Sequence, residues 1–154
     1  HPSLYSLVKE KLGPKRDVEK TLPNVYPSNM FIGDYLRLYS FTKMGDYALV
    51  EKEIREYAET MVEKTGTIWE FDSTYASLTH CFPSYVVNLL TECLTGISLI
   101  SEKEKAVYLT SFEPVCKGAF KIKIPTVGGY ISASCDEGGK LSYSLPDGYS
   151  LKRR

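Results

Sequence analysis

A short segment in the middle of the chain gathers the side chains best suited to chemistry. The segment 66–82, GTIWEFDSTYASLTHCF, contains the single tryptophan, Trp69, which is followed directly by Glu70. An aromatic ring can stack on a pyranose face while a neighbouring carboxylate acts at the anomeric carbon, so this pair indicates sugar chemistry. Asp72 could orient a water molecule or a hydroxyl group, and His80 could hydrogen-bond sugar hydroxyls.

Each of these side chains also has an ordinary structural explanation. A tryptophan at a helix end is usually part of the core, a surface glutamate is usually solvated, and a histidine before a helix often packs or caps. Glycosidic cleavage further requires a second carboxyl group, about 5–10 Å from the first. Asp34 and Glu63 are candidates by residue type, but both fall within predicted helices, where we expect solvated, structural positions.

Composition limits the classes of protein to which the chain can belong. Its 154 residues suffice for one domain or two small ones, and 43% are hydrophobic, which is enough for a packed core. Lys plus Arg and Asp plus Glu balance at 19 each, which argues against nucleic acid or an acidic membrane surface as a partner. No apolar run has the length needed to cross a bilayer. Twelve tyrosines suit carbohydrate binding as well as ordinary packing.

The cysteines and histidines show no metal-binding pattern. None of the four cysteines forms a CxxC pair, and the two histidines, His1 and His80, have no metal-ligand spacing. We therefore expect neither a metal nor another cofactor. Disulfides are possible, but the spacing favours scattered small hydrophobic residues in a reducing compartment such as the cytoplasm. The chain starts at His1 without a signal-like segment, so we expect it to begin inside a longer polypeptide that would carry any targeting signal.

The first hundred residues show a helical period. We predict helices over residues 3–12, 28–42, 46–64 and 84–95, with Ser28 and Ser84 as N-caps and Gly66 as a C-terminal cap. The third of these helices, 46–64, has the clearest apolar stripe. The predicted stripes are Leu4, Leu7, Val8 and Leu12; Phe31, Tyr35, Leu38 and Tyr39; Tyr47, Val50, Ile54, Tyr57 and Met61; and Val86, Leu89, Leu90, Cys93 and Leu94.

The remainder of the chain alternates with a period close to two. Strands are predicted within 106–113, 119–125, 130–137 and 140–154, separated by turn signals at Gly128-Gly129, Gly138-Gly139 and Asp147-Gly148. We expect an antiparallel sheet of four or five strands. The predicted class is therefore α+β, with antiparallel helical hairpins over residues 1–100 and a small β domain over 101–154.

Three pieces of sequence occur in an order that resembles a known family. They are NMFIGDYLRL at Asn29–Leu38, TGTIWE at Thr65–Glu70 and SLTHCFPS at Ser77–Ser84. Together with the tail from Cys116 to Gly148, they resemble the C-terminal part of bacterial α-L-rhamnosidases of glycoside hydrolase family 78. The resemblance covers nearly the whole chain after about Asn24. It implies the last helices of a six-hairpin (α/α)6 barrel, followed by a small β-sandwich.

The resemblance also implies roles for individual residues. Glu70 takes the position of the general base in an inverting mechanism, and His80 takes a substrate-binding position. Trp69 and the loop backbone would shape the pocket, and Asp72 is a further substrate-binding candidate. One residue departs from the family pattern, because Pro83 stands where a Gly or Ala is usual.

The same resemblance implies that part of the machinery lies elsewhere. The family's general acid and its main sugar-gripping acidic residues come from an earlier part of the barrel, so the expected partners are a rhamnoside substrate and the rest of the barrel. Alone, such a segment would be inactive and would expose an apolar face prone to self-association. Two alternatives remain: a non-catalytic carbohydrate-binding or structural fragment, and another six-hairpin glycosidase acting on α-glucosides or uronides.

Overall fold

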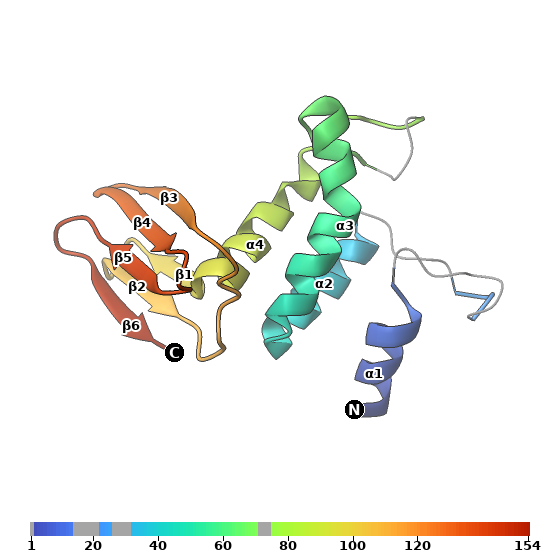
Figure 1. The fold of residues 1–154 in the computed structure, drawn as a ribbon, viewed down its shortest axis with the longest axis horizontal. Helices are drawn as coiled ribbons and strands as arrows, with labels where there is room; N and C mark the ends of the chain where they lie inside the picture. The colour runs from blue at the N-terminus through green and yellow to red at the C-terminus, as the bar shows by residue number, and fades with distance from the viewer. Residues whose placement is uncertain (1, 14–21, 26–31, 71–74) are drawn as a thin grey trace.

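The computed structural model describes residues 2–13, 22–25, 32–70 and 75–154 of the chain. Helices occupy one end of the molecule and β-strands the other, with the helix α4 leading from the first to the second (Figure 1). The predicted α+β class is confirmed by this arrangement.

Four α-helices and one short 3-10 helix precede the strands in the described residues. In chain order they are α1 (Pro2–Lys11), α2 (Gly33–Met44), α3 (Tyr47–Thr65), the 3-10 helix η1 (Phe82–Ser84) and α4 (Tyr85–Thr95). Each predicted helix is present, with its ends shifted by a few residues. The predicted start of the second helix, including the Ser28 cap, lies outside the described residues.

The core of the helical half is built on the apolar stripe of α3. All five predicted stripe residues of α3 are buried, and they pack with α2, α4 and Trp69 in one cluster. Burial of such a stripe stabilises a helix more than intrinsic propensity does, because apolar surface leaves water. Glu51 lies outside the predicted stripe and is also buried, and its carboxylate pairs with Arg55 and Lys117.

The buried face of α2 differs from the predicted one. Leu38 and Phe41 are fully buried, whereas Tyr39 is 41% exposed and Tyr35 is half-buried. The pattern was misleading because two charged residues, Asp34 and Arg37, lie on the buried face beside the apolar ones. On α1, similarly, Leu4 and Leu7 stay exposed and Val8 contributes the packing.

A buried ion pair holds α2, α3 and α1 together. The guanidinium of Arg37 donates to both carboxylate oxygens of Glu53, at 2.9 and 2.6 Å, in a bidentate arrangement. It also donates to the carbonyl oxygens of Val8 and Lys9 at the end of α1, and it stacks on the ring of Phe41 at 4.6 Å. A single side chain therefore joins three helices.

Glycine ends α3, as the sequence predicted. Gly66 has φ of +72°, a left-handed conformation that glycine adopts without steric cost, and its N–H donates to the carbonyl oxygen of Val62 at 2.7 Å. The chain therefore leaves α3 sharply at Gly66.

The predicted cap at the start of α4 is not formed. Ser84 occupies the N-cap position of α4, but its side chain makes no capping hydrogen bond.

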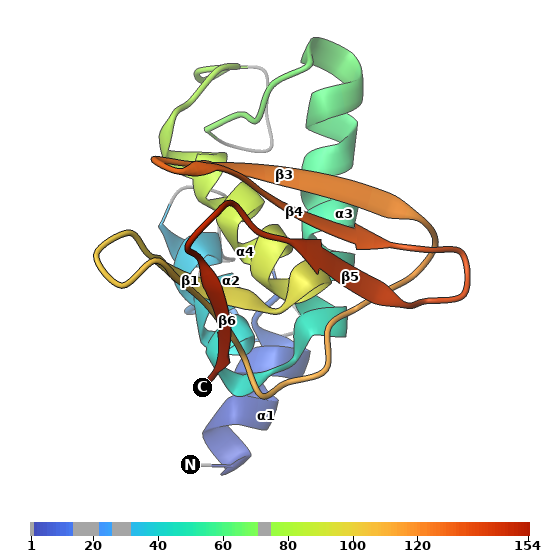
Figure 2. The same ribbon diagram turned by 90° about the vertical axis from the view of Figure 1, so that its left-hand side faces the viewer.

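The β domain consists of two three-stranded sheets rather than one sheet (Figure 2). One sheet has the order β1–β2–β6, in which β1 and β2 are antiparallel and β2 and β6 are parallel. The other has the order β3–β4–β5 and is antiparallel throughout. The strands are β1 (Ile97–Ser101), β2 (Ala106–Leu109), β3 (Phe120–Thr126), β4 (Gly129–Cys135), β5 (Leu141–Ser144) and β6 (Ser150–Arg153).

Two details of the predicted sheet are wrong. Strand β1 begins at Ile97, directly after Gly96, whereas we placed the change from helical to β period near Ser101. The turn at Asp147-Gly148 joins β5 to β6, which belong to different sheets and do not pair as a hairpin. A period of two reveals that a segment is a strand, but not which strand lies beside it.

A disulfide bond joins Cys116 to Cys135, with 6.3 Å between the Cα atoms. Our expectation that the cysteines are scattered hydrophobic residues is therefore wrong for this pair and right for Cys93, which is a buried thiol. Spacing along the chain could not predict the pair, because 19 residues separate the two cysteines and only the fold brings them together.

Among the residues that the structure describes, no helix has the length and apolar character required to span a membrane.

We expect the Arg37–Glu53 pair to be essential for the packing of the helices. Arg37→Met should lower the free energy of unfolding by about 3 kcal/mol, since it leaves the Glu53 carboxylate buried without its partner. Urea unfolding followed by circular dichroism measures this loss. The matched control is Lys52→Met, which breaks the exposed Lys52–Glu56 pair of 3.8 Å and should change stability by less than about 0.5 kcal/mol. Equal losses in the two variants would contradict the assignment.

Candidate functional site

The loop after α3 is anchored by its tryptophan. Trp69 is 4% exposed and belongs to the helical core, and its indole N–H donates to the hydroxyl of Thr65 at 2.7 Å. The amine of Lys64 lies 5.8 Å from the centre of its ring. Since no face of the ring is open, any influence of Trp69 on a pocket comes from fixing the loop.

Two backbone hydrogen bonds close the loop on itself. The N–H of Glu70 donates to the carbonyl oxygen of Ser77 at 2.9 Å, and the N–H of His80 donates to that of Ile68 at 3.1 Å. The hydroxyl of Thr67 also donates to the carbonyl of Leu78. The segment that carries Glu70 therefore runs alongside the segment that carries His80, although ten positions separate these two residues in the sequence.

The predicted site residues differ in their burial, and one of them is not among the described residues. Glu70 and His80 are both half-buried, and within the described part of the chain no hydrogen bond or ion pair holds the Glu70 carboxylate. Asp72 lies outside the described residues. Glu63 is exposed on α3, as we expected.

Asp34 is buried, which makes the predicted solvated position wrong. We expected a solvated position, but Asp34 is 1% exposed, and its Oδ1 atom has no hydrogen-bond partner. Burial, followed by repulsion from Glu53, raises the pKa of Asp34 from its usual 3.8 to about 7, against the opposing attraction of Arg37. A carboxyl group in this state can hold a proton near neutral pH.

Asp34 lies at the junction of three helices. Tyr85 is the first residue of α4. Burial raises the pKa of its phenol most, and the nearby Asp34 carboxylate raises it further. Glu53 comes from α3 and Arg37 from α2 itself. One signal in the sequence could have revealed this position, because Asp34 precedes Leu38 and Phe41 by four and seven residues and so shares their helix face.

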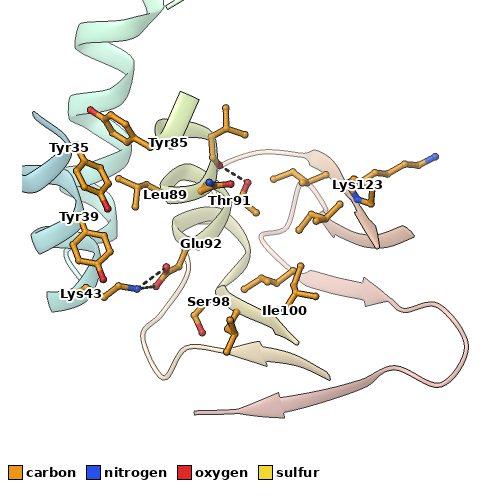
Figure 3. A pocket seen from close by; sticks show the side chains of 17 residues that line it. Tyr35, Tyr39, Lys43, Tyr85, Leu89, Thr91, Glu92, Ser98, Ile100 and Lys123 are labelled. Carbon is orange, nitrogen blue, oxygen red and sulfur yellow. Dashed lines mark hydrogen bonds and ion pairs between the residues drawn. The ribbon is translucent and has the colours of Figure 1, made fainter. Parts of the chain in front are cut away.

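A trough also lies between the helices and the β domain (Figure 3). It has a volume of about 620 Å³, its floor is α4, and its walls are α2 on one side and strands β1 and β3 on the other. Tyr35, Tyr39 and Tyr85 line the helical wall, with the rings of Tyr35 and Tyr85 4.8 Å apart. Neither Glu70 nor His80 lines this trough.

Polar groups line the trough beside the tyrosines. The amine of Lys43 lies 5.3 Å from the centre of the Tyr39 ring and pairs with the carboxylate of Glu92 at 3.2 Å. Asn88, on the exposed face of α4, also lines the trough. An aromatic wall with nearby amide, amine and carboxylate groups can bind an amphipathic small molecule such as a sugar.

Within the described ranges, no group of three His, Cys, Asp or Glu side chains is placed to hold a metal ion.

Comparison with known proteins returns no match: no family model fits the chain, and no curated protein or solved structure is significantly similar to it. The geometry of the loop and of the trough therefore carries the functional proposal.

The state of Asp34 leads to a pH dependence of stability. Since its pKa is higher in the folded chain than in the unfolded one, the folded state binds the proton more tightly between about pH 4 and pH 7. The free energy of unfolding should therefore fall as the pH rises through this window, by up to about 4 kcal/mol. Urea unfolding at pH 4, 5.5 and 7 measures the slope.

The control is Asp34→Asn, an isosteric change that cannot titrate. This variant should lose most of the fall in stability between pH 4 and 7, whereas Asp147→Asn, at an exposed turn, should retain it. A slope that survives Asp34→Asn unchanged would mean that another group is responsible.

Proposed function

We propose that the chain is the C-terminal segment of an inverting α-L-rhamnosidase-like glycoside hydrolase, in which Glu70 is the general base and His80 binds the sugar. The observation that carries this proposal is the closed loop, in which two backbone hydrogen bonds bring Glu70 and His80 onto adjacent segments. A base and a sugar-binding group must act on one ring at once, so their adjacency is a requirement of the mechanism.

The anchoring of Trp69, the residue before Glu70, supports a catalytic role for Glu70. Its neighbour Trp69 is fixed in the core, so the backbone of Glu70 starts from a well-defined position. The carboxylate itself is bound by no described residue and is only half-buried. Catalytic residues typically combine a fixed backbone with a side chain that no other protein group binds, because the position of the side chain must be set before the substrate binds.

The role of Glu70 in the reaction would be to activate water. Its carboxylate accepts a proton from a water molecule, and the resulting hydroxide-like oxygen attacks the anomeric carbon on the face opposite the leaving group. Inverting enzymes hold the two carboxyl groups about 6.5–9.5 Å apart to leave room for this water. The general acid would come from the part of the barrel that precedes these residues, which makes the segment inactive alone.

The surface of the helical half supports a place within a larger helical assembly. Leu36 of α2 and Val87 of α4 are 56% and 60% exposed, and Leu4 of α1 is 58% exposed. Apolar side chains on several neighbouring helices would be covered if further helices of an (α/α)6 barrel packed against them. The same side chains could otherwise drive self-association of the isolated chain.

The experiment that tests the proposal is substitution of Glu70 in the longer polypeptide of which we propose this chain to be the end. Glu70→Gln should lower kcat for hydrolysis of 4-nitrophenyl α-L-rhamnopyranoside by roughly 100-fold or more, because a general base is lost while shape is kept. The melting temperature should stay within about 2 °C of the parent.

The matched control is Glu63→Gln, which changes an exposed glutamate on the neighbouring helix and should leave kcat unaltered. A decrease of less than about tenfold for Glu70→Gln would remove Glu70 from the mechanism. Full activity on α-glucosides or uronides, with none on the rhamnoside, would favour another six-hairpin glycosidase and keep the role of the base.

The trough favours a second candidate function, non-catalytic carbohydrate binding. Tyr39 presents an exposed ring beside Lys43, Glu92 and Asn88, which is the combination of a flat apolar surface and hydrogen-bonding groups that a pyranose requires. This function needs no general acid, so it would suit the isolated chain.

Substitution of Tyr39 separates the two candidates. If the trough binds sugar, Tyr39→Ala should weaken the binding of methyl α-L-rhamnopyranoside by roughly tenfold, since a stacking surface is lost. Chemical-shift titration of the isolated chain by NMR measures the affinity and locates the site. Tyr130→Ala, at a ring that is 63% exposed on β4, is the control and should bind normally. Shifts confined to residues around Glu70 and His80 would instead place the sugar at the loop.

A further inference from the structure

The connection between β2 and β3 is held by the helical half of the molecule. We call residues 110–119 the strap segment; its course past the helices can be followed in Figure 2. The N–H of Val115 donates to the carbonyl oxygen of Cys93 in α4 at 2.8 Å. The ring of Phe112 packs edge-on against Tyr47 of α3, with 5.9 Å between ring centres.

The strap segment fits closely where it meets the helices. The φ of Gly45 is +79°, and a Cβ atom at this position would come within 2.4 Å of the Phe112 ring. Lys117 lies 3.8 Å from the carboxylate of Glu51 on α3. The strap segment is therefore seated on α3, on α4 and on the turn between α2 and α3.

The other end of this connection is covalent. Cys116, within the strap segment, is bonded to Cys135 at the end of β4. Strand β4 is the central strand of its sheet, since it pairs with β3 on one side and with β5 on the other. The disulfide thus ties the middle of sheet β3–β4–β5 to a segment that is seated on the helices.

Non-covalent contacts hold the same sheet in place independently. The hydroxyl of Tyr143 on β5 donates to the carbonyl oxygen of Thr95 at 2.5 Å. Ile131 and Ala133 of β4 pack in an apolar cluster with Ile97 and Val107 of the other sheet. If the disulfide were lost, the sheet would therefore stay folded, but it would have one fewer attachment to the helices.

We propose that the Cys116–Cys135 disulfide is a redox-sensitive strap, and that its opening by a small thiol such as glutathione loosens sheet β3–β4–β5 from the helices while α2, α3 and α4 stay packed. The loosened sheet includes β3, which forms part of the trough wall, so the redox state would set the geometry of the trough. The strap operates whether or not Glu70 is a catalytic base.

The chemistry of opening is thiol–disulfide exchange. A glutathione thiolate attacks the sulfur of Cys116, which is half-buried, and Cys135, which is 3% exposed, leaves as a thiolate and takes up a proton. A second glutathione thiolate attacks the mixed disulfide and releases Cys116 as a thiol. Two thiols are oxidised to one glutathione disulfide, and one protein disulfide is reduced.

The remaining cysteines do not compete equally for this exchange. Cys93 is fully buried, and burial raises the pKa of its thiol to about 12, so it remains protonated and unreactive. Cys81 is exposed, which makes it the free thiol able to exchange with an opened strap. Replacing Cys81 by serine isolates the strap.

Hydrogen–deuterium exchange of the Cys81→Ser chain, with and without reduced glutathione under native conditions, tests the proposal. Thiol counting by mass spectrometry should first show one free thiol without glutathione and three with it. Amides of β3, β4 and β5 should then exchange about tenfold faster in the reduced chain, whereas those of α2 and α3 should change less than about twofold. Reoxidation should restore the slow exchange.

Three outcomes would overturn the proposal: no disulfide in the purified chain, a disulfide that glutathione does not reduce, or a reduced chain whose exchange is unchanged or is faster throughout. Cys116→Ser provides an independent check, because it removes the bond at the half-buried position without reductant. This variant should exchange like the reduced chain and be insensitive to glutathione, and a pattern like that of the oxidised chain would also overturn the proposal.

Discussion

The burial of one indole ring, that of Trp69, determines where the loop after α3 places its side chains. Trp69 is fixed in the helical core and hydrogen-bonded to Thr65 in the last turn of α3, so the chain that leaves Gly66 must return across the helix end. Two backbone hydrogen bonds then close the loop, which places Glu70 and His80 on adjacent segments. Without the ring in the core, these residues would lie on a long flexible connection, where ordering them for catalysis would cost conformational entropy.

A group of charged side chains inside the helical half is the second unusual feature. Arg37 and Glu53 satisfy one another with two hydrogen bonds, whereas Asp34 has an oxygen atom without a partner. Burying a carboxylate without compensation is unfavourable, and the folded chain responds by favouring the protonated acid. The pair joins α1 to the other helices, while Asp34 retains a titratable proton near the start of α4.

The β domain is connected to the helices through few but specific contacts. Gly96 ends α4 and β1 begins at the next residue, so no connecting loop separates the helix from the strand. The hydroxyl of Tyr143, the strap segment and the disulfide hold the second sheet against the same helix end. The trough opens between these attachments, and its shape depends on how both halves are held together.

The sequence by itself determined the class of fold, the four helices, the burial of the α3 stripe and the stop at Gly66, because periodicity and glycine chemistry are local. It also singled out Glu70, Trp69 and His80 by residue type. Only the tertiary structure decided that one oxygen atom of Asp34 lacks a hydrogen-bond partner, that the strands form two sheets, and that Cys116 pairs with Cys135. These outcomes depend on contacts between residues distant in the chain, and a local pattern contains no information about which distant segments will meet.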